Sequence, residues 1–202
     1  MTECREVAPD VWLGLAPCMR AAAGDVPGDR WRADRAAADR AVAAAVAASG
    51  FSRGDCATSR SHTCGAAAAI VAPFGIMIGV DLVAVERVRL RHARVVLSGR
   101  ERGTLARYGS VYPALAWAVK EAAAKAAGDP FRHFPRGLTI EEDASGLVVR
   151  AAGRGRTTFE AGWEVIGRFL CAWVYERDCP PNGHSMSRRS PPNLRGVSQR
   201  IR

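Results

Sequence analysis

The residues that first point to chemistry lie in the stretch WAVKEAAAK, residues 117–125. Trp117, Glu121 and Lys125 are spaced four residues apart, so on a helix they share one face. Lysine occurs only at positions 120 and 125, and the other 27 basic residues are arginine. Arginine serves equally well in a surface ion pair, whereas lysine can lose a proton and brings a compact charge to phosphate. The bias indicates chemistry or a tight fit at these two positions, and an exposed Glu121–Lys125 ion pair is the alternative.

Asp81 is the second candidate, because it interrupts the apolar run IGVDLVAV. A carboxylate within such a strand is costly unless it is paired or ligates something. Magnesium prefers oxygen ligands, commonly one or two carboxylates with water and substrate phosphates. Asp81 and Glu121 therefore form a candidate Mg²⁺ site. In the alternative interpretation Asp81 only caps the segment that follows the strand.

Ser61 and His62 form the third candidate, in the stretch SRSHTCG. The composition of residues 51–65 indicates a loop. A hydroxyl, an imidazole and loop amides together can bind phosphate. A loop histidine that is merely solvated is the alternative.

The elements that must position these residues follow from periodicity and capping signals. We expect strands over 10–17, 66–73 and 75–85, the last two forming a hairpin around Pro73 and Gly75. Helices are expected over 28–50, from Ser98 onward and over 112–128, where Ser98 and Glu101 form a capping box. Strand-like runs follow at 137–143, 146–153 and 162–176. This order predicts an α+β fold, and the strand, helix and hairpin recur loosely on both sides of Val85.

The charge of the chain is uneven. Of the formal net charge of +9, five units come from arginines after residue 180, in a Pro- and Ser-rich segment without acidic residues. We expect residues 180–202 to be a disordered basic tail. The remaining chain is only moderately basic, which suits a phosphate-bearing ligand or an acidic protein as well as nucleic acid. A small nucleic-acid-binding protein is therefore an alternative that rests on charge alone, since no binding motif is present.

The expected cellular location rests on the first ten residues and on the longest apolar run. The first ten residues are charged and have no apolar core like that of a signal peptide. The longest apolar run is interrupted by Pro73 and several glycines, which disfavours a membrane helix. We expect a cytoplasmic protein with no membrane association. Its six cysteines include no C-x-x-C pair, so we expect them to be reduced and without a metal or redox role.

Three stretches in this order resemble the 4′-phosphopantetheinyl transferase superfamily. They are the G-V-D strand at 79–81, the L-S-G-R-E segment at 97–101 and W-A-V-K-E-A-A-A-K at 117–125. The closing stretch FLCAWVYE resembles the surfactin-type subfamily, and residues 10–50 resemble its first half more loosely. The resemblance implies two similar α/β halves related by pseudo-twofold symmetry, over residues 1–75 and 76–179, and it favours a monomer.

The resemblance implies transfer of the phosphopantetheine arm from CoA to a carrier-protein serine, with Mg²⁺ and with release of 3′,5′-ADP. It gives the metal to Asp81 and Glu121. The catalytic candidates are Lys125, Glu121 and, as a second candidate base, Glu101. CoA contacts are implied for Ser61, His62, Trp117, Lys120 and Lys125. For the 3′-phosphate we keep Arg40 as the candidate, with Arg30, Arg32 and Arg35 as alternatives.

The implied partner is an acidic acyl or peptidyl carrier protein. The basic run that follows the metal strand could dock it, through Arg87, Arg89, Arg91 and Arg94. Two features depart from the surfactin type: Val83 stands where a second acidic residue is usual, and the Gly-Lys-Pro stretch before Ser-His is absent. Val83 and the shortened first half, where the region between the first expected helix and Ser61 is short, motivate the alternative of a catalytically impaired protein that binds CoA or a carrier without turnover.

Overall fold

The computed structural model describes residues 2–17, 27–63, 65–128, 135, 137–152 and 157–177. Within these ranges the chain forms two antiparallel sheets. The first contains, in spatial order, β1 (Glu3–Ala8), β2 (Val11–Pro17), β4 (Ala66–Pro73) and β3 (Cys56–Thr63). The second contains β5 (Ile78–Ala84), β9 (Phe169–Glu176), β8 (Thr158–Ile166), β7 (Gly146–Ala151) and β6 (Leu138–Asp143). The helices are α1 (Pro27–Ser49), α2 (Leu90–Val96), α3 (Gly99–Leu105) and α4 (Tyr112–Ala126), with short 3₁₀ turns η1 (Val85–Arg87) and η2 (Ala106–Val111).

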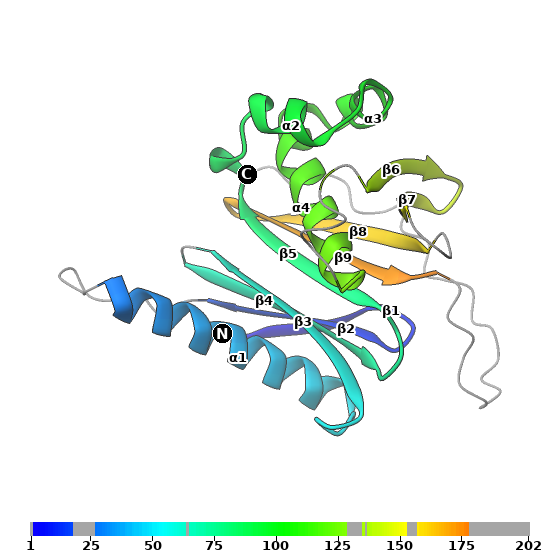
Figure 1. Ribbon diagram of the computed structural model, residues 1–202. Coiled ribbons are helices and arrows are strands. Elements are labelled where there is room, and N and C mark those ends of the chain that lie inside the picture. The colour runs from blue at the N-terminus through cyan, green and yellow to red at the C-terminus, as the bar shows by residue number, and fades with distance from the viewer. Residues whose placement is uncertain are drawn as a thin grey trace.

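The elements form layers (Figure 1). A core of apolar side chains from β2, β4, β5 and β9 lies between the two sheets. Helix α4 covers the other face of the second sheet, and α1 lies along the other face of the first. The mixed architecture confirms the predicted α+β class. None of the described helices is both long and apolar enough to cross a membrane.

Two glycines allow the helices to approach the sheets closely. A Cβ atom on Gly79 of β5 would lie 1.9 Å from the carbonyl oxygen of Ala122 in α4. A Cβ atom on Gly14 of β2 would lie 2.3 Å from the carbonyl oxygen of Ala41 in α1. The small residues that line both helices serve the same close contact.

The two halves share a topology. In each, a strand leads to a helix and then to a hairpin whose last strand pairs with the first, as in β2-α1-β3-β4 and β5-α4-β8-β9. The predicted boundary after residue 75 lies between β4 and β5, where the chain passes from one sheet to the other. The pseudo-twofold relation and the division at residue 75 stay predictions.

Several predicted elements are confirmed. Helix α1 ends at Ser49, before Gly50 with a φ of 73°, and α4 ends before Gly128 with a φ of 75°. The capping box that opens α3 is present, since Ser98 Oγ accepts from the Glu101 amide at 3.3 Å and Glu101 Oε2 accepts from the Ser98 amide at 2.7 Å. Local capping signals therefore located these helices correctly.

Four predictions about strands are wrong. β1 was not expected, since its residues are largely charged or polar. Residues 56–63, expected as loop, form β3. β4 and β5 are not a hairpin: β4 pairs with β2 and β3, whereas β5 pairs with β9. The run at 162–176 is two strands, β8 and β9, which turn at Gly167 with a φ of 58°. In these cases the secondary structure is determined by pairing with other strands, which local composition does not show.

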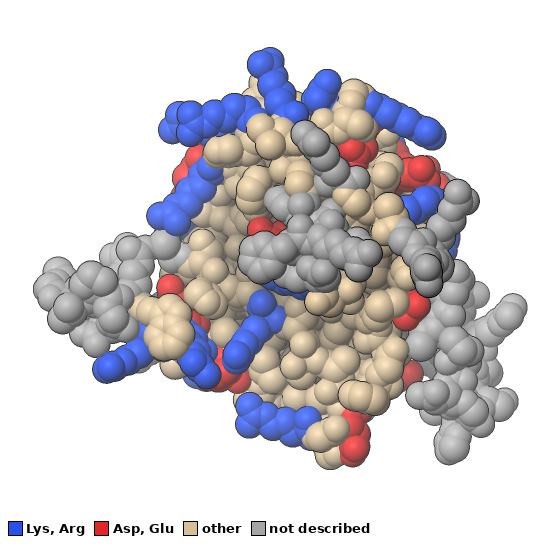
Figure 2. Space-filling model, in the orientation of Figure 1, with Lys and Arg blue, Asp and Glu red and all other residues tan. Residues whose placement is uncertain are grey.

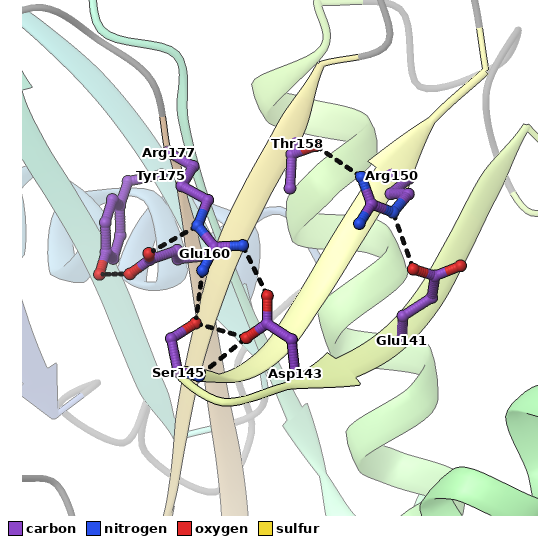
Figure 3. A network of polar contacts seen from close by, with 8 residues as sticks. All are labelled: Glu141, Asp143, Ser145, Arg150, Thr158, Glu160, Tyr175 and Arg177. Atoms are coloured by element: carbon purple, nitrogen blue, oxygen red, sulfur yellow. Dashed lines mark hydrogen bonds and ion pairs between the residues drawn. The ribbon is translucent and has the colours of Figure 1, made fainter.

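Part of the second sheet carries a polar network (Figure 3). Arg177 contacts Asp143 Oδ2 at 2.6 Å and Ser145 Oγ at 3.0 Å, and it pairs with Glu160 at 3.3 Å. The Tyr175 hydroxyl donates to Glu160 at 2.5 Å. These contacts tie the β6–β7 turn to β8 and to the end of β9. The predicted tail after residue 180 lies outside the described residues, as do three of the six cysteines; the others, Cys4, Cys56 and Cys171, are free thiols.

Candidate active site

Asp81 lies on the face of β5 that α4 covers. Its neighbours Ile78, Val80 and Leu82 point into the core between the sheets, so alternation turns Asp81 toward the helix. The side chain is 3% exposed. Lys125 Nζ on α4 lies 2.8 Å from Asp81 Oδ1 and donates to the Val80 carbonyl at 3.0 Å. The close approach at Gly79 is what brings this lysine within reach of the strand.

Glu121 stands one helical turn before Lys125. Its Oε1 lies 3.9 Å from Lys125 Nζ, and its Oε2 accepts a hydrogen bond from Trp117 Nε1 at 2.8 Å. Burial raises the pKa of Glu121, the negative charge of Asp81 raises it further, and Lys125 and Trp117 oppose the rise. The structure therefore brings Asp81, Trp117, Glu121 and Lys125 into one cluster.

Ser61 joins this cluster from the first sheet. It lies on β3, is 8% exposed, and donates from Oγ to Asp81 Oδ1 at 2.8 Å. The predicted loop is therefore a strand here, and the Ser61 hydroxyl contacts the carboxylate. The CoA contact predicted for Ser61 stays a prediction. His62 points away, is exposed, and has Nδ1 3.9 Å from Asp34 on α1.

Glu101 and Lys120 form a separate pair in the interior. Lys120 is 1% exposed, and its Nζ lies 2.8 Å from Glu101 Oε1 and donates to the carbonyls of Val96 at 2.6 Å and Pro135 at 3.2 Å. Glu101 Oε1 also accepts from the Ile140 amide at 2.9 Å. Three acceptors use the three protons of the ammonium group. These contacts give Lys120 and Glu101 a structural role; the CoA contact predicted for Lys120 and the base role predicted for Glu101 stay predictions.

The pKa values of this pair reflect competition between burial and contact. Burial lowers the pKa of Lys120, and the contact with Glu101 counteracts it. Burial by itself would raise the pKa of Glu101, but the hydrogen bond from Lys120 and those from the Ile140 and Ser98 amides hold it below its ordinary value. Glu101 is thereby kept as a carboxylate that organises structure.

The residues around Asp81 fit a magnesium ion. Asp81 Oδ2 is buried and has no hydrogen-bond partner among the described residues. A buried carboxylate oxygen without a partner is unfavourable unless something else satisfies it. The described residues contain no group of three or more His, Cys, Asp or Glu side chains that could hold a metal ion. Two carboxylates suit Mg²⁺, which keeps waters and substrate phosphates as its other ligands.

Comparison with known proteins gives the family of this part of the chain. The model of the 4′-phosphopantetheinyl transferase superfamily matches residues 77–173. Residues 77–173 belong to the 4′-phosphopantetheinyl transferase superfamily. Asp81, Trp117, Glu121 and Lys125 all lie within this transferase segment, and Ser61 lies outside it. The surfactin-type subfamily stays a prediction.

One of the 21 solved chains that match this chain is a holo-(acyl-carrier-protein) synthase from Bacillus anthracis str. Ames, crystallised in complex with CoA (3′,5′-ADP). It is 19% identical, its TM-score is 0.42, and the match covers 50% of this chain and 96% of that chain. No curated protein matches the chain.

The predicted docking arginines follow the C-terminal end of β5. Arg87 lies in η1, Arg89 precedes α2, and Arg91 and Arg94 lie in α2; all four are exposed. Figure 2 shows basic side chains gathered at the top of the molecule, where Figure 1 places α2 and α3. Arg40 lies apart from them, exposed on α1, where it donates to the Pro17 carbonyl at 3.1 Å.

Proposed function

We propose that the protein transfers the 4′-phosphopantetheine arm of CoA to a serine of an acyl or peptidyl carrier protein and releases 3′,5′-ADP. The observation that carries this proposal is the buried Asp81 Oδ2, which has no hydrogen-bond partner among the residues that the structure describes and lies beside Glu121 and Lys125. The membership of residues 77–173 in the transferase superfamily supports it. The protein would act in the cytoplasm, where we expect the chain to reside.

In the proposed reaction the carrier serine oxygen attacks the phosphorus that bears the pantetheine arm. A new P–O bond forms, the P–O bond to the 3′,5′-ADP group breaks, and the serine proton leaves to a water molecule. Asp81 and Glu121 would hold Mg²⁺, which supplies charge neutralisation at the pyrophosphate. Lys125 would leave Asp81 Oδ1 for a phosphate oxygen and stabilise the charge that develops there. Trp117 orients Glu121 through its indole N–H.

Mass spectrometry tests the proposal directly. The protein is incubated with CoA, Mg²⁺ and an apo carrier protein, and the carrier should gain the mass of one phosphopantetheine arm. Asp81→Asn and Glu121→Gln should abolish the gain, whereas Glu3→Gln, an equally small change at an exposed carboxylate, should not. Full activity of either site variant would contradict the metal assignment.

Val83 keeps one alternative open. The position two residues after Asp81 is apolar and packs against the α4 core, so it offers no third carboxylate. This observation favours a protein that binds CoA or a carrier with impaired transfer. In that case isothermal titration would detect CoA binding while the carrier mass stayed unchanged for every carrier tried.

The proposed partner is an acidic carrier protein that docks on η1 and α2. Leu90 and Val95 are 44% and 74% exposed and stand among the four arginines. A surface on which exposed apolar side chains are surrounded by arginines suits an acidic amphipathic helix.

We propose a monomer, because one chain supplies both Ser61 and Asp81 from its two sheets. Light scattering at the concentration of the assay would test it, and a stable dimer or trimer would contradict it.

A further inference from the structure

The two oxygens of Asp81 have different surroundings. Oδ1 receives two hydrogen bonds, from Ser61 Oγ and from Lys125 Nζ, both at 2.8 Å. Oδ2 is buried and receives none from the described residues. If the carboxylate rotated freely, its two oxygens would exchange their surroundings. The hydrogen bonds to Oδ1 therefore determine which oxygen has no donor among the described residues.

Ser61 is held firmly enough to impose this orientation. Two residues earlier on β3, Ser59 Oγ accepts a hydrogen bond from the Val80 amide at 3.2 Å. The two serines lie on the same face of β3 and contact consecutive residues of β5. Side chains therefore set how the edge of the first sheet lies along the edge of the second, with Ser61 opposite Asp81.

The two donors to Asp81 Oδ1, Lys125 and Ser61, differ in their exposure and in the other groups that they can contact. Lys125 is partly exposed and lies beside Glu121, where a phosphate oxygen would compete for its ammonium group. Ser61 is buried, and the Asp81 carboxylate is its described side-chain partner. When Lys125 turns to a phosphate, Ser61 is the donor that remains on Oδ1.

We propose that Ser61 is a positioning residue that locks the Asp81 carboxylate so that Oδ2 faces the cation. This inference rests on the proposed function, because it takes the cation to be the Mg²⁺ of the transfer reaction. It gives the serine of the Ser61-His62 pair a role in metal binding that does not depend on a contact with CoA. Loss of the hydroxyl should weaken cation affinity even with no CoA or carrier present.

Titration of the protein with Mn²⁺ alone, followed by the electron paramagnetic resonance signal of free Mn²⁺, tests this role. Ser61→Ala should weaken Mn²⁺ binding about tenfold, as expected when a group that orients a metal ligand is lost. Ser61→Thr keeps the hydroxyl and should bind close to wild type. Thr58→Ala, at an exposed position of the same strand, is the matched control. Should Ser61→Ala fold poorly, Ser61→Cys keeps the size with a weaker donor.

The outcomes separate the two proposals. Wild-type protein that fails to bind Mn²⁺ overturns the metal site and the positioning role together. Wild-type binding with equal affinity in Ser61→Ala overturns the positioning role and leaves the proposed function standing. Equal weakening in Ser61→Ala and Ser61→Thr assigns the effect to packing and also overturns the role of the hydroxyl.

Discussion

Lys125 Nζ on α4 lies 2.8 Å from Asp81 Oδ1 on β5, 44 residues earlier in the chain. One of the two lysines of the chain is thus held against the carboxylate that we assign to the metal. The other, Lys120, is buried against Glu101 at 2.8 Å. The two positions differ in access, and so the two residues should respond differently to substitution.

Lys125→Met should separate turnover from cation binding. Transfer should fall about 100-fold or more, the usual loss when one electrostatic group is removed from a transition state. Mn²⁺ affinity should rise, because a positive charge next to Asp81 is gone. Transfer rates and Mn²⁺ titrations of the same preparations provide the check. Weaker Mn²⁺ binding would show that Lys125 organises the site and does not compete with the cation.

Lys120→Met and Glu101→Gln should each lower the free energy of unfolding by about 3–5 kcal/mol, since each leaves a buried group without its partner. The double variant should lose less than the two singles combined. Urea denaturation measures all three. Arg150→Met, which breaks the exposed contact with Glu141 at 2.7 Å, is the control and should cost about 1 kcal/mol or less. Additive losses would contradict the coupling of Lys120 with Glu101.

Arg87→Glu with Arg91→Glu should slow association with an acidic carrier and flatten its dependence on salt, because exposed charges act mainly on the association rate. Stopped-flow binding at several ionic strengths measures this. Arg53→Glu, an exposed reversal before β3, is the control and should change the rate little. If the double reversal associates as fast as wild type, the carrier docks elsewhere.

Gly79→Ala should destabilise the fold by several kcal/mol and weaken Mn²⁺ binding, because the new methyl group would force α4 away from Asp81. Gly103→Ala, where a Cβ atom meets open space inside α3, should instead stabilise by about 0.5–1 kcal/mol. Thermal unfolding of both variants compares them. Equal melting temperatures would mean that the helix can shift without cost.

The polar network of Figure 3 predicts a pH dependence. Hydrogen bonds from Ser145 and Arg177, together with the charge of Arg177, lower the pKa of Asp143 from 3.8 to about 2. A lowered folded-state pKa contributes stability above the unfolded value, and that contribution is lost as pH falls from about 4 to about 2. Asp143→Asn should therefore be less stable by up to about 1 kcal/mol at pH 7, the ceiling for an exposed pair. Urea denaturation at several pH values should show that the difference in free energy of unfolding between wild type and Asp143→Asn narrows below pH 4. A difference that does not change with pH would exclude the Asp143 carboxylate as its cause.

Helical spacing is what made much of the site predictable. Trp117, Glu121 and Lys125 recur every four residues, and that spacing alone placed them on one face. The contact of Lys125 with Asp81 needed one further guess, that an acid in an apolar strand has a partner. The family motifs placed Asp81 and Glu121 at one metal site and Lys125 at the reacting phosphate, but they did not predict the ion pair of Lys125 with Asp81.

The contact between Lys120 and Glu101 could not be predicted from the sequence, because their partners lie on other elements. The capping box used Glu101 Oε2, as predicted, but Oε1 is bound by Lys120 and by the Ile140 amide, 39 residues away. Lys120 completes its contacts with the Val96 and Pro135 carbonyls, which no local pattern marks.

β3 escaped prediction because its inward face is polar. Ser59 and Ser61 satisfy that face by hydrogen bonds to β5, where most strands would bury apolar side chains. The strand does alternate between inward-facing and exposed residues, but its inward-facing residues are serines. A serine-containing stretch is typical of a loop, so the alternation did not indicate a strand. A search for serines spaced by two could have found it.

The hydrogen bond from Ser61 to Asp81 crosses from the first sheet to the second. Neither sheet alone can therefore complete the proposed metal site. Docking of the sheets through the core between them would be a precondition for the proposed transfer, and activity would report on that docking more sensitively than secondary structure does. On gentle heating, cation affinity should be the first property to fade, while the helices of each half still give their full circular dichroism.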